Sequence, residues 1–231
     1  MPLPSPLLRC ALLLALSGPA VAADGPAQVT LTSGTFNGTV SLAVDSDRRL
    51  LSGYFDDGRC RFQFDGPLQP VALPQRSELG EAYSLRGWDP RTPERSFSVA
   101  LYTLARGGFR DQLTIEADDR DPNRPAACRW RTSLDRDSWV SSSFIGVRVV
   151  SARHAKVSAG KPDGDGVRLE RSTEAAVPRG TVVWVGKTYS PGWNLPGLVQ
   201  ANWYQPVGTP HGGYLREADL YRLPAQEEEL P

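Results

Sequence analysis

The chain of 231 residues has few of the side chains from which catalytic and metal sites are usually built. It contains two histidines and three cysteines, and its 26 basic residues are balanced by 26 acidic ones. A balanced charge argues against a nucleic-acid-binding protein, which needs a basic face. The sequence has no nucleophile elbow, His-Glu-x-x-His pattern, phosphate-binding loop or dinucleotide fingerprint. We therefore predict no catalytic residue, no cofactor and no metal site.

Long apolar runs are also missing. The run at residues 10–16 is too short to span a bilayer, which needs about 20 residues. Arg9 precedes this run, and helix breakers and small residues follow it at residues 17–23, as in a secretory signal peptide. We therefore expect cleavage near Ala22 or Ala23 and a periplasmic or secreted mature protein without a transmembrane segment.

Loss of this segment removes Cys10 and leaves Cys60 and Cys128. An even pair of cysteines in an oxidising compartment predicts a disulfide. The bond would close a loop of about 70 residues, which the chain-entropy model values at roughly 4 kcal/mol. Two free thiols or a metal site are the alternatives. Two cysteines with only His154 and His211 elsewhere make a poor set of metal ligands.

Helical periodicity is scarce, and short alternating runs separated by glycine, proline and aspartate dominate the chain. With 22 glycines and 20 prolines, the pattern predicts an all-β fold. We expect two small β domains, the first a curled antiparallel sheet or barrel. Residues 66–96 are rich in proline and charge and are interpreted as a long connection. The strands expected in the first half are residues 29–31, 35–44, 50–55, 60–64, 96–102, 112–117 and 128–132.

A polar stretch at residues 133–145 is interpreted as a linker, with the domain boundary near residue 142. A loop is expected at residues 160–166, and strands at 147–150, 181–188, 198–204 and 212–220. The predicted division is a signal peptide at 1–23, an N-terminal β-barrel or sandwich domain at 24–142, a second domain at 143–224 and a disordered acidic tail at 225–231.

The second half contains a turn with Gly180, a valine-rich strand at residues 181–188 and a terminal segment at 212–220. In this order the segments resemble the bacterial Src-homology-3-like barrel. Tyr214 stands where that family usually has tryptophan, and residues 194–197 look like an insertion. The resemblance covers about residues 147–223 and implies a small barrel with a groove for peptides or cell-wall stem peptides. The first half faintly resembles an up-and-down calyx. The positions that fit the first resemblance are Gly180, Trp193, Gly213, Leu215, Asp219 and Leu220.

Aromatic residues crowd the second half. Aromatic side chains with a polar end suit binding faces, because they bury a large area while losing little side-chain entropy. The alternative is that they form core, and we expect about half of the set to be buried. The predicted groove is formed by Trp184, Tyr189, Trp193, Trp203, Tyr204 and Tyr214.

Other residues could carry chemistry, and each has a simpler structural interpretation. The pairs at residues 56–57 and 118–119 could act as glycosidase carboxylates, but aspartate is favoured in turns for its local hydrogen bonds. The segment at 163–166 has part of a calcium-loop spacing but lacks the distal glutamate. His154 and His211 are interpreted as exposed bystanders.

Together these observations predict an exported, non-catalytic binding protein of the bacterial envelope. Its partner would be an envelope protein or a peptidoglycan fragment, and a specific version is an inhibitor or immunity protein for a periplasmic enzyme or toxin. A cell-wall hydrolase with a targeting module and a carrier of a small apolar ligand are the alternative hypotheses.

Overall fold

The structure is a computed structural model. It describes residues 31–72, 79–104, 112–128, 131–141, 143–164, 166–171, 176–186, 195–203 and 211–224. The predicted signal segment at 1–23 and acidic tail at 225–231 lie outside the described residues. Within the described ranges, no helix has the length and apolar character needed to cross a membrane.

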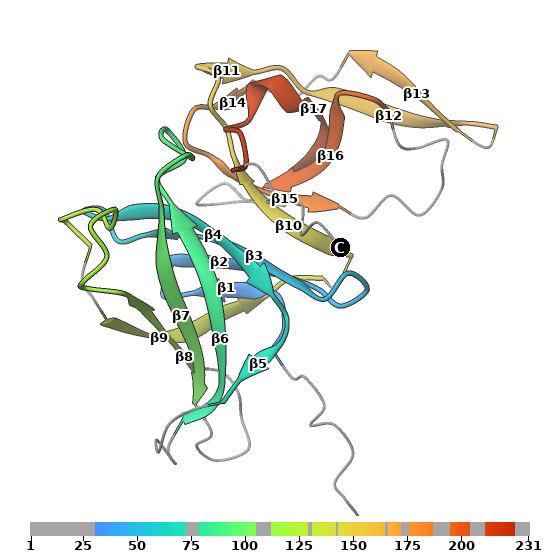
Figure 1. The fold of residues 1–231 in the computed structure, drawn as a ribbon. Helices are drawn as coiled ribbons and strands as arrows, with labels where there is room; N and C mark the ends of the chain where they lie inside the picture. The colour runs from blue at the N-terminus through green and yellow to red at the C-terminus, as the bar shows by residue number, and fades with distance from the viewer. Residues whose placement is uncertain are drawn as a thin grey trace, which may run out of the picture.

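Eight strands of the first half close into an antiparallel barrel (Figure 1). Successive strands pair with each other, and closure comes from the pairing of the first strand with the last. The short strand β5 (Pro70–Val71) is not one of the eight and pairs with β6 (Leu79–Trp88). The predictions of an all-β chain and of a barrel in its first half are confirmed. The barrel strands are β1 (Gly34–Phe36), β2 (Val40–Asp45), β3 (Leu50–Asp56), β4 (Arg61–Pro67), β6 (Leu79–Trp88), β7 (Ser96–Leu104), β8 (Gln112–Ala117) and β9 (Arg131–Trp139).

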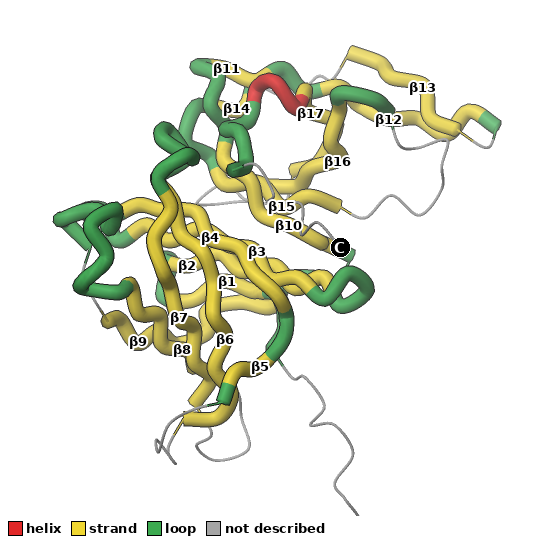
Figure 2. Tube along the Cα trace, viewed as in Figure 1, coloured by secondary structure: helices red, strands yellow, loops and turns green. Residues whose placement is uncertain are grey.

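A second group of strands follows β9 and forms a sheet in the order β10-β15-β16-β17-β12-β13. A small pairing of β11 (His154–Ala155) with β14 (Val177–Pro178) accompanies it. The single helical element of the described residues is a 3-10 turn at Glu217–Asp219 (Figure 2). The strands of the larger sheet are β10 (Phe144–Val149), β12 (Ser158–Asp163), β13 (Gly166–Arg171), β15 (Val182–Gly186), β16 (Leu198–Trp203) and β17 (His211–Arg216).

Three segments expected to be irregular contain strands. Strand β6 occupies ten residues of the predicted connection at 66–96, and β9 occupies much of the predicted linker at 133–145. Strands β12 and β13 pair across the predicted loop at 160–166. These predictions were wrong because polar side chains occupy the outer face of a barrel strand or the exposed face of a hairpin. The last barrel strand ends at Trp139 and the second sheet begins at Phe144.

Alternation along the strands directs one set of side chains into the barrel. Val40, Leu42 and Val44 point inward from β2, and Phe62 and Phe64 point inward from β4. The ring of Phe62 stacks on Phe55 at 4.9 Å between centroids and meets Phe97 edge-on at 5.3 Å. Aromatic pairs in these geometries contribute beyond their buried area. The interior of the barrel is therefore occupied by its own side chains.

The close packing inside the barrel requires glycine at residue 53. An added Cβ would lie 2.2 Å from Phe64 Cζ and 2.6 Å from the Ser41 carbonyl oxygen. Gly53→Ala is therefore expected to lower the free energy of unfolding by about 1–3 kcal/mol, measured by urea denaturation. Gly186→Ala is the control, because the nearest atom to its added Cβ lies at 3.6 Å. Equal stability of the two variants would contradict this account of the packing.

The predicted disulfide is present in the structure. Cys60 and Cys128 are bonded, with their Cα atoms 4.7 Å apart. Both cysteines are buried and belong to the barrel core. Cys60 ends the turn between β3 and β4, and Cys128 lies between β8 and β9. Because successive strands are antiparallel, both connections lie at the same end of the barrel, which the disulfide ties together.

The second unit packs against the outer face of the barrel. Strand β10 lies over β2 and β3 (Figure 1). Gln63 Nε2, pointing outward from β4, donates to the Val147 carbonyl oxygen at 2.9 Å, and Val147 N donates to Ser52 Oγ at 3.1 Å. The apolar part of this contact is a buried cluster that we call the junction cluster, made up of Ala43, Tyr54, Phe144, Val147, Val149 and Trp184.

The burial of Tyr54 in the junction cluster is expected to make the free energy of unfolding decrease at alkaline pH. Burial, with a smaller contribution from Asp56, raises its pKa from 10.0 to about 12. A raised pKa means that the fold favours the neutral phenol, so the full contribution is present below about pH 10. We expect stability to fall as the pH rises from about 10 to about 12. Urea denaturation across this range should show a weaker loss for Tyr54→Phe than for the unaltered protein. An identical loss in both would contradict the assignment.

Candidate functional site

The predicted aromatic groove can be examined at two of its six side chains. Trp184 is 3% exposed and belongs to the junction cluster, and Tyr214 is 4% exposed. Tyr214 covers Gly160, where an added Cβ would lie 2.6 Å from its ring. These two side chains are therefore core and do not line an open groove.

The side chains of the other four predicted groove residues are not described, so they do not test the prediction of a groove. Only the backbone of Trp203 is described, as part of β16. Tyr189, Trp193 and Tyr204 lie outside the described residues. A groove formed by these four residues stays a prediction.

The paired aspartates support turns. Asp57 Oδ1 accepts hydrogen bonds from the backbone N–H groups of Arg59 and Cys60 at 2.9 and 2.7 Å. Asp118 Oδ1 accepts one from Arg120 N at 2.9 Å. These hydrogen bonds stabilise the turns, so a structural role accounts for both Asp57 and Asp118.

The predicted calcium-loop fragment lies largely in a hairpin. Asp163 and Gly164 are in the turn between β12 and β13, and Asp165 is outside the described residues. His154 is exposed and pairs in β11, and His211 begins β17. No group of three or more His, Cys, Asp or Glu within the described ranges could hold a metal ion.

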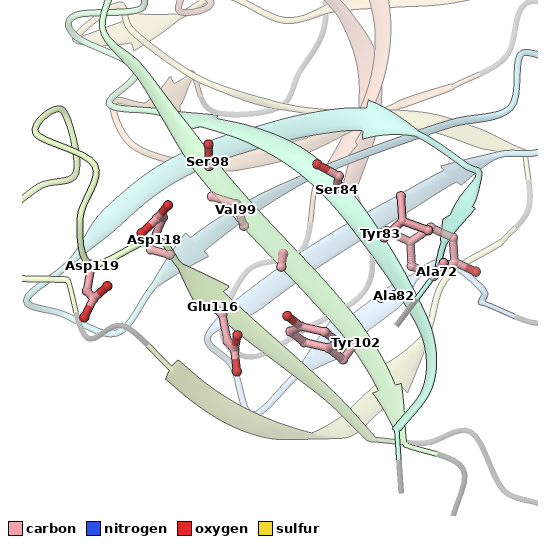
Figure 3. A pocket seen from close by; sticks show the side chains of 13 residues that line it. Ala72, Ala82, Tyr83, Ser84, Ser98, Val99, Tyr102, Glu116, Asp118 and Asp119 are labelled. Carbon is pink, nitrogen blue, oxygen red and sulfur yellow. The ribbon is translucent and has the colours of Figure 1, made fainter. Parts of the chain in front are cut away.

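A hollow of about 530 Å³ lies on the outer face of the barrel. Tyr83 and Val99 point into the barrel, so the side chains that alternate with them on β6 and β7 point outward. At the hollow these outward side chains are small: Ser84 on β6, and Ser98 and Ala100 on β7. We call this feature the outer-face groove, and Figure 3 shows its lining.

Strand register brings the groove residues together. Ser84 pairs with Ala100, and Ala100 pairs with Glu116 of β8, so these three lie in one row across the sheet. Tyr102 lies two residues along β7 from Ala100, and Figure 3 shows its ring beside Glu116. The small side chains of Ser84, Ser98 and Ala100, beside the larger Tyr102 and Glu116, leave the space that forms the groove.

Carboxylates give the groove its charge. Glu116 forms an ion pair with Arg131, with Oε1 and Nε 3.3 Å apart. Asp118 and Asp119 follow β8, are exposed, and pair with no cation of the described residues. Figure 3 shows both at the end of β8. The groove therefore has an acidic end that suits a basic side chain.

The outer-face groove was not predicted from the sequence, although residues 118–119 were considered as possible acids. The small residues on β6 lie inside the segment that was interpreted as a connection. Alternating serine and alanine at residues 82, 84, 98 and 100 was the available signal. Only the register of β6 against β7 shows that these positions share one face.

Comparison of the chain with models of known families, with curated proteins and with solved structures gives no match.

Proposed function

We propose that this chain is an exported, non-catalytic binding protein of the bacterial envelope, and that its outer-face groove contacts a protein partner. The observation that carries the proposal is the groove of about 530 Å³ with an acidic end. This volume is within the range of ligand-binding sites, roughly 300–1,000 Å³. A lysine or arginine of the partner, lying along the small side chains and ending near Asp118 and Asp119, suits both its shape and its charge.

The disulfide supports the exported location, because disulfides persist in oxidising compartments. A rigid, disulfide-bonded barrel is also suited to binding without rearrangement, which reduces the entropy lost on association. An inhibitor or immunity protein for a periplasmic enzyme or toxin is the specific form of the proposal. A peptidoglycan fragment is the second kind of partner, since stem peptides can carry free amino groups.

The arrangement of the second unit supports the proposal of a Src-homology-3-like barrel. Strands β15, β16 and β17 form a meander, the hairpin of β12 and β13 joins it through β17, and a 3-10 turn precedes Leu220. Leu220 forms a bridge with Val150, which brings the end of the unit back to its beginning.

The two alternative functions have less support. A hydrolase needs free acids, but Asp57 and Asp118 accept hydrogen bonds from their own turns. A carrier of an apolar ligand needs interior space, but the rings of Phe55, Phe62 and Phe97 pack against one another inside the barrel. Binding at the surface is therefore the function that we propose.

Filling the groove tests the proposal. Ser84→Trp is expected to lower the amount of partner captured from a periplasmic extract by about tenfold or more, because it occupies the space that the partner would use. The captured material is identified by mass spectrometry and assayed for murein. The control is Ser46→Trp, in the exposed turn after β2.

The outcomes separate the possibilities. A protein partner that Ser84→Trp loses and Ser46→Trp retains supports the proposal. Murein lost in the same pattern identifies the second kind of partner. Equal capture by both variants, or no partner for the unaltered protein, rejects the outer-face groove as the binding site.

A further inference from the structure

A second concavity, of about 400 Å³, lies where the barrel meets the second unit. The barrel contributes Tyr54, Arg61 and Arg91, and the second unit contributes Arg179 and Tyr221. We call this the junction cleft. It shares no lining residue with the outer-face groove, and the inference below does not depend on the proposed function.

Two arginines of the barrel are matched by carboxylates. Arg91 contacts Asp89 through two nitrogens, with Nη2 2.7 Å from Oδ2 and Nε 3.0 Å from Oδ1. Arg61 Nε lies 3.0 Å from Asp56 Oδ2. These pairs hold the two side chains at the barrel side of the cleft and neutralise their charge.

Arg179 is different, because no carboxylate of the described residues pairs with it. Its Nε donates to the Ser151 carbonyl oxygen at 2.7 Å, which holds the stem in place. Its two terminal nitrogens have no hydrogen-bond acceptor within the described part of the chain. The charges to be counted at the junction cleft are those of three arginines and of the two carboxylates that pair with Arg61 and Arg91, namely Asp56 and Asp89. The cleft therefore has one excess positive charge, that of Arg179.

The cleft also offers a neutral donor and apolar walls. The phenol of Tyr54 lines the cleft and, like that of an ordinary tyrosine, is protonated at neutral pH, so it can donate a hydrogen bond. Val149 and Pro90 are buried and line the same space. A hydrogen-bond donor and an unmatched guanidinium that line one cleft with apolar walls suit an oxyanion attached to a small apolar body.

We propose that the junction cleft binds an oxyanion, the carboxylate or phosphate group of a small ligand or peptide end, with Arg179 as its charged partner and Tyr54 as a hydrogen-bond donor. The planar guanidinium of arginine can donate two parallel hydrogen bonds to either group. Because the two units line opposite sides, a bound anion would contact both of them.

Isothermal titration calorimetry of the intact protein tests this with three probes. These are inorganic phosphate, an acetylated dipeptide with a free terminal carboxylate, and the same dipeptide as its terminal amide. We expect phosphate or the acid to bind and the amide not to bind. Arg179→Gln should raise the dissociation constant about tenfold or more, because it removes a charged hydrogen-bond donor.

The matched control is Arg168→Gln, an exposed arginine of the same unit that pairs with Glu170 at 3.2 Å. It should leave the dissociation constant unchanged. Arg179→Lys keeps the charge but loses the two-pronged geometry. Its dissociation constant should therefore lie between that of the unaltered protein and that of Arg179→Gln. Far-ultraviolet circular dichroism confirms that each variant is folded.

Tighter binding of phosphate than of the acid identifies a phosphate ligand, and the reverse order identifies a peptide end. The inference is overturned if neither probe binds at about 10 mM, a concentration that detects even weak sites. It is also overturned if the amide binds as well as the acid, or if Arg168→Gln weakens binding as much as Arg179→Gln does.

Discussion

Loss of the disulfide is expected to lower the free energy of unfolding by about 4 kcal/mol. The bond joins positions 68 residues apart. In the chain-entropy model, closing a loop of this length removes much of the freedom of the unfolded chain. Cys60→Ala combined with Cys128→Ala isolates this effect, because neither substitution leaves a free thiol. Urea denaturation of this double variant and of the oxidised protein provides the measurement.

The same experiment with reductant added separates the bond from the side chains. Reduced protein and the double variant should unfold at similar urea concentrations, both well below the oxidised protein. Because the cysteines tie together one end of the barrel, hydrogen exchange should increase first in β4 and β9. A double variant within about 1 kcal/mol of the oxidised protein would show that the barrel does not depend on this bond.

Removing Trp184 is expected to cost about 3–5 kcal/mol, as for other large buried aromatic side chains. Trp184 lies in the junction cluster and pairs in register with Val147, whose backbone is hydrogen-bonded to the barrel. Trp184→Ala therefore weakens both the second unit and its contact with the barrel. Differential scanning calorimetry should show one transition for the unaltered protein and two for the variant, because the units no longer unfold together.

Leu169→Ala is the matched control for this experiment. Leu169 is on β13 of the same unit but is 37% exposed, so its loss should change stability by about 0.5 kcal/mol or less. A single transition at a slightly lower temperature for Trp184→Ala would mean that the remaining junction contacts suffice to couple the units. A change as small as that of Leu169→Ala would contradict the assignment of Trp184 to a core.

Several features could be predicted from local sequence. Alternation of apolar and polar residues identified the strands at 60–64 and 112–117, because a barrel strand has one face inside and one outside. The single strand predicted at 35–44 is divided in the structure into β1 and β2, which pair as a hairpin. The disulfide was predicted from the pair of cysteines that follows residue 23 in the sequence. The turns followed from aspartate and glycine, such as the one at Asp57, whose carboxylate caps its own backbone.

Other features could not be predicted locally. Strands β6 and β9 contain many polar and charged residues, so their composition resembles that of a loop, and only pairing with their neighbours makes them strands. Trp184 was expected in a groove because an amphipathic aromatic suits a surface equally well. The packing of β10 on the barrel placed it inside.

The amino-acid sequence by itself determined the class of fold and the pairing of Cys60 with Cys128. It also determined which side chains point into the barrel from the strands with clear alternation of apolar and polar residues. Each of these depends on residues close in sequence or on a count. The tertiary structure alone decided where the two concavities lie. Ser84 and Ala100 become neighbours through strand register, and Arg179 and Tyr54 line one cleft because the second unit packs against the barrel. Surface hollows are formed by side chains that are far apart in the sequence, so a local sequence pattern cannot predict them.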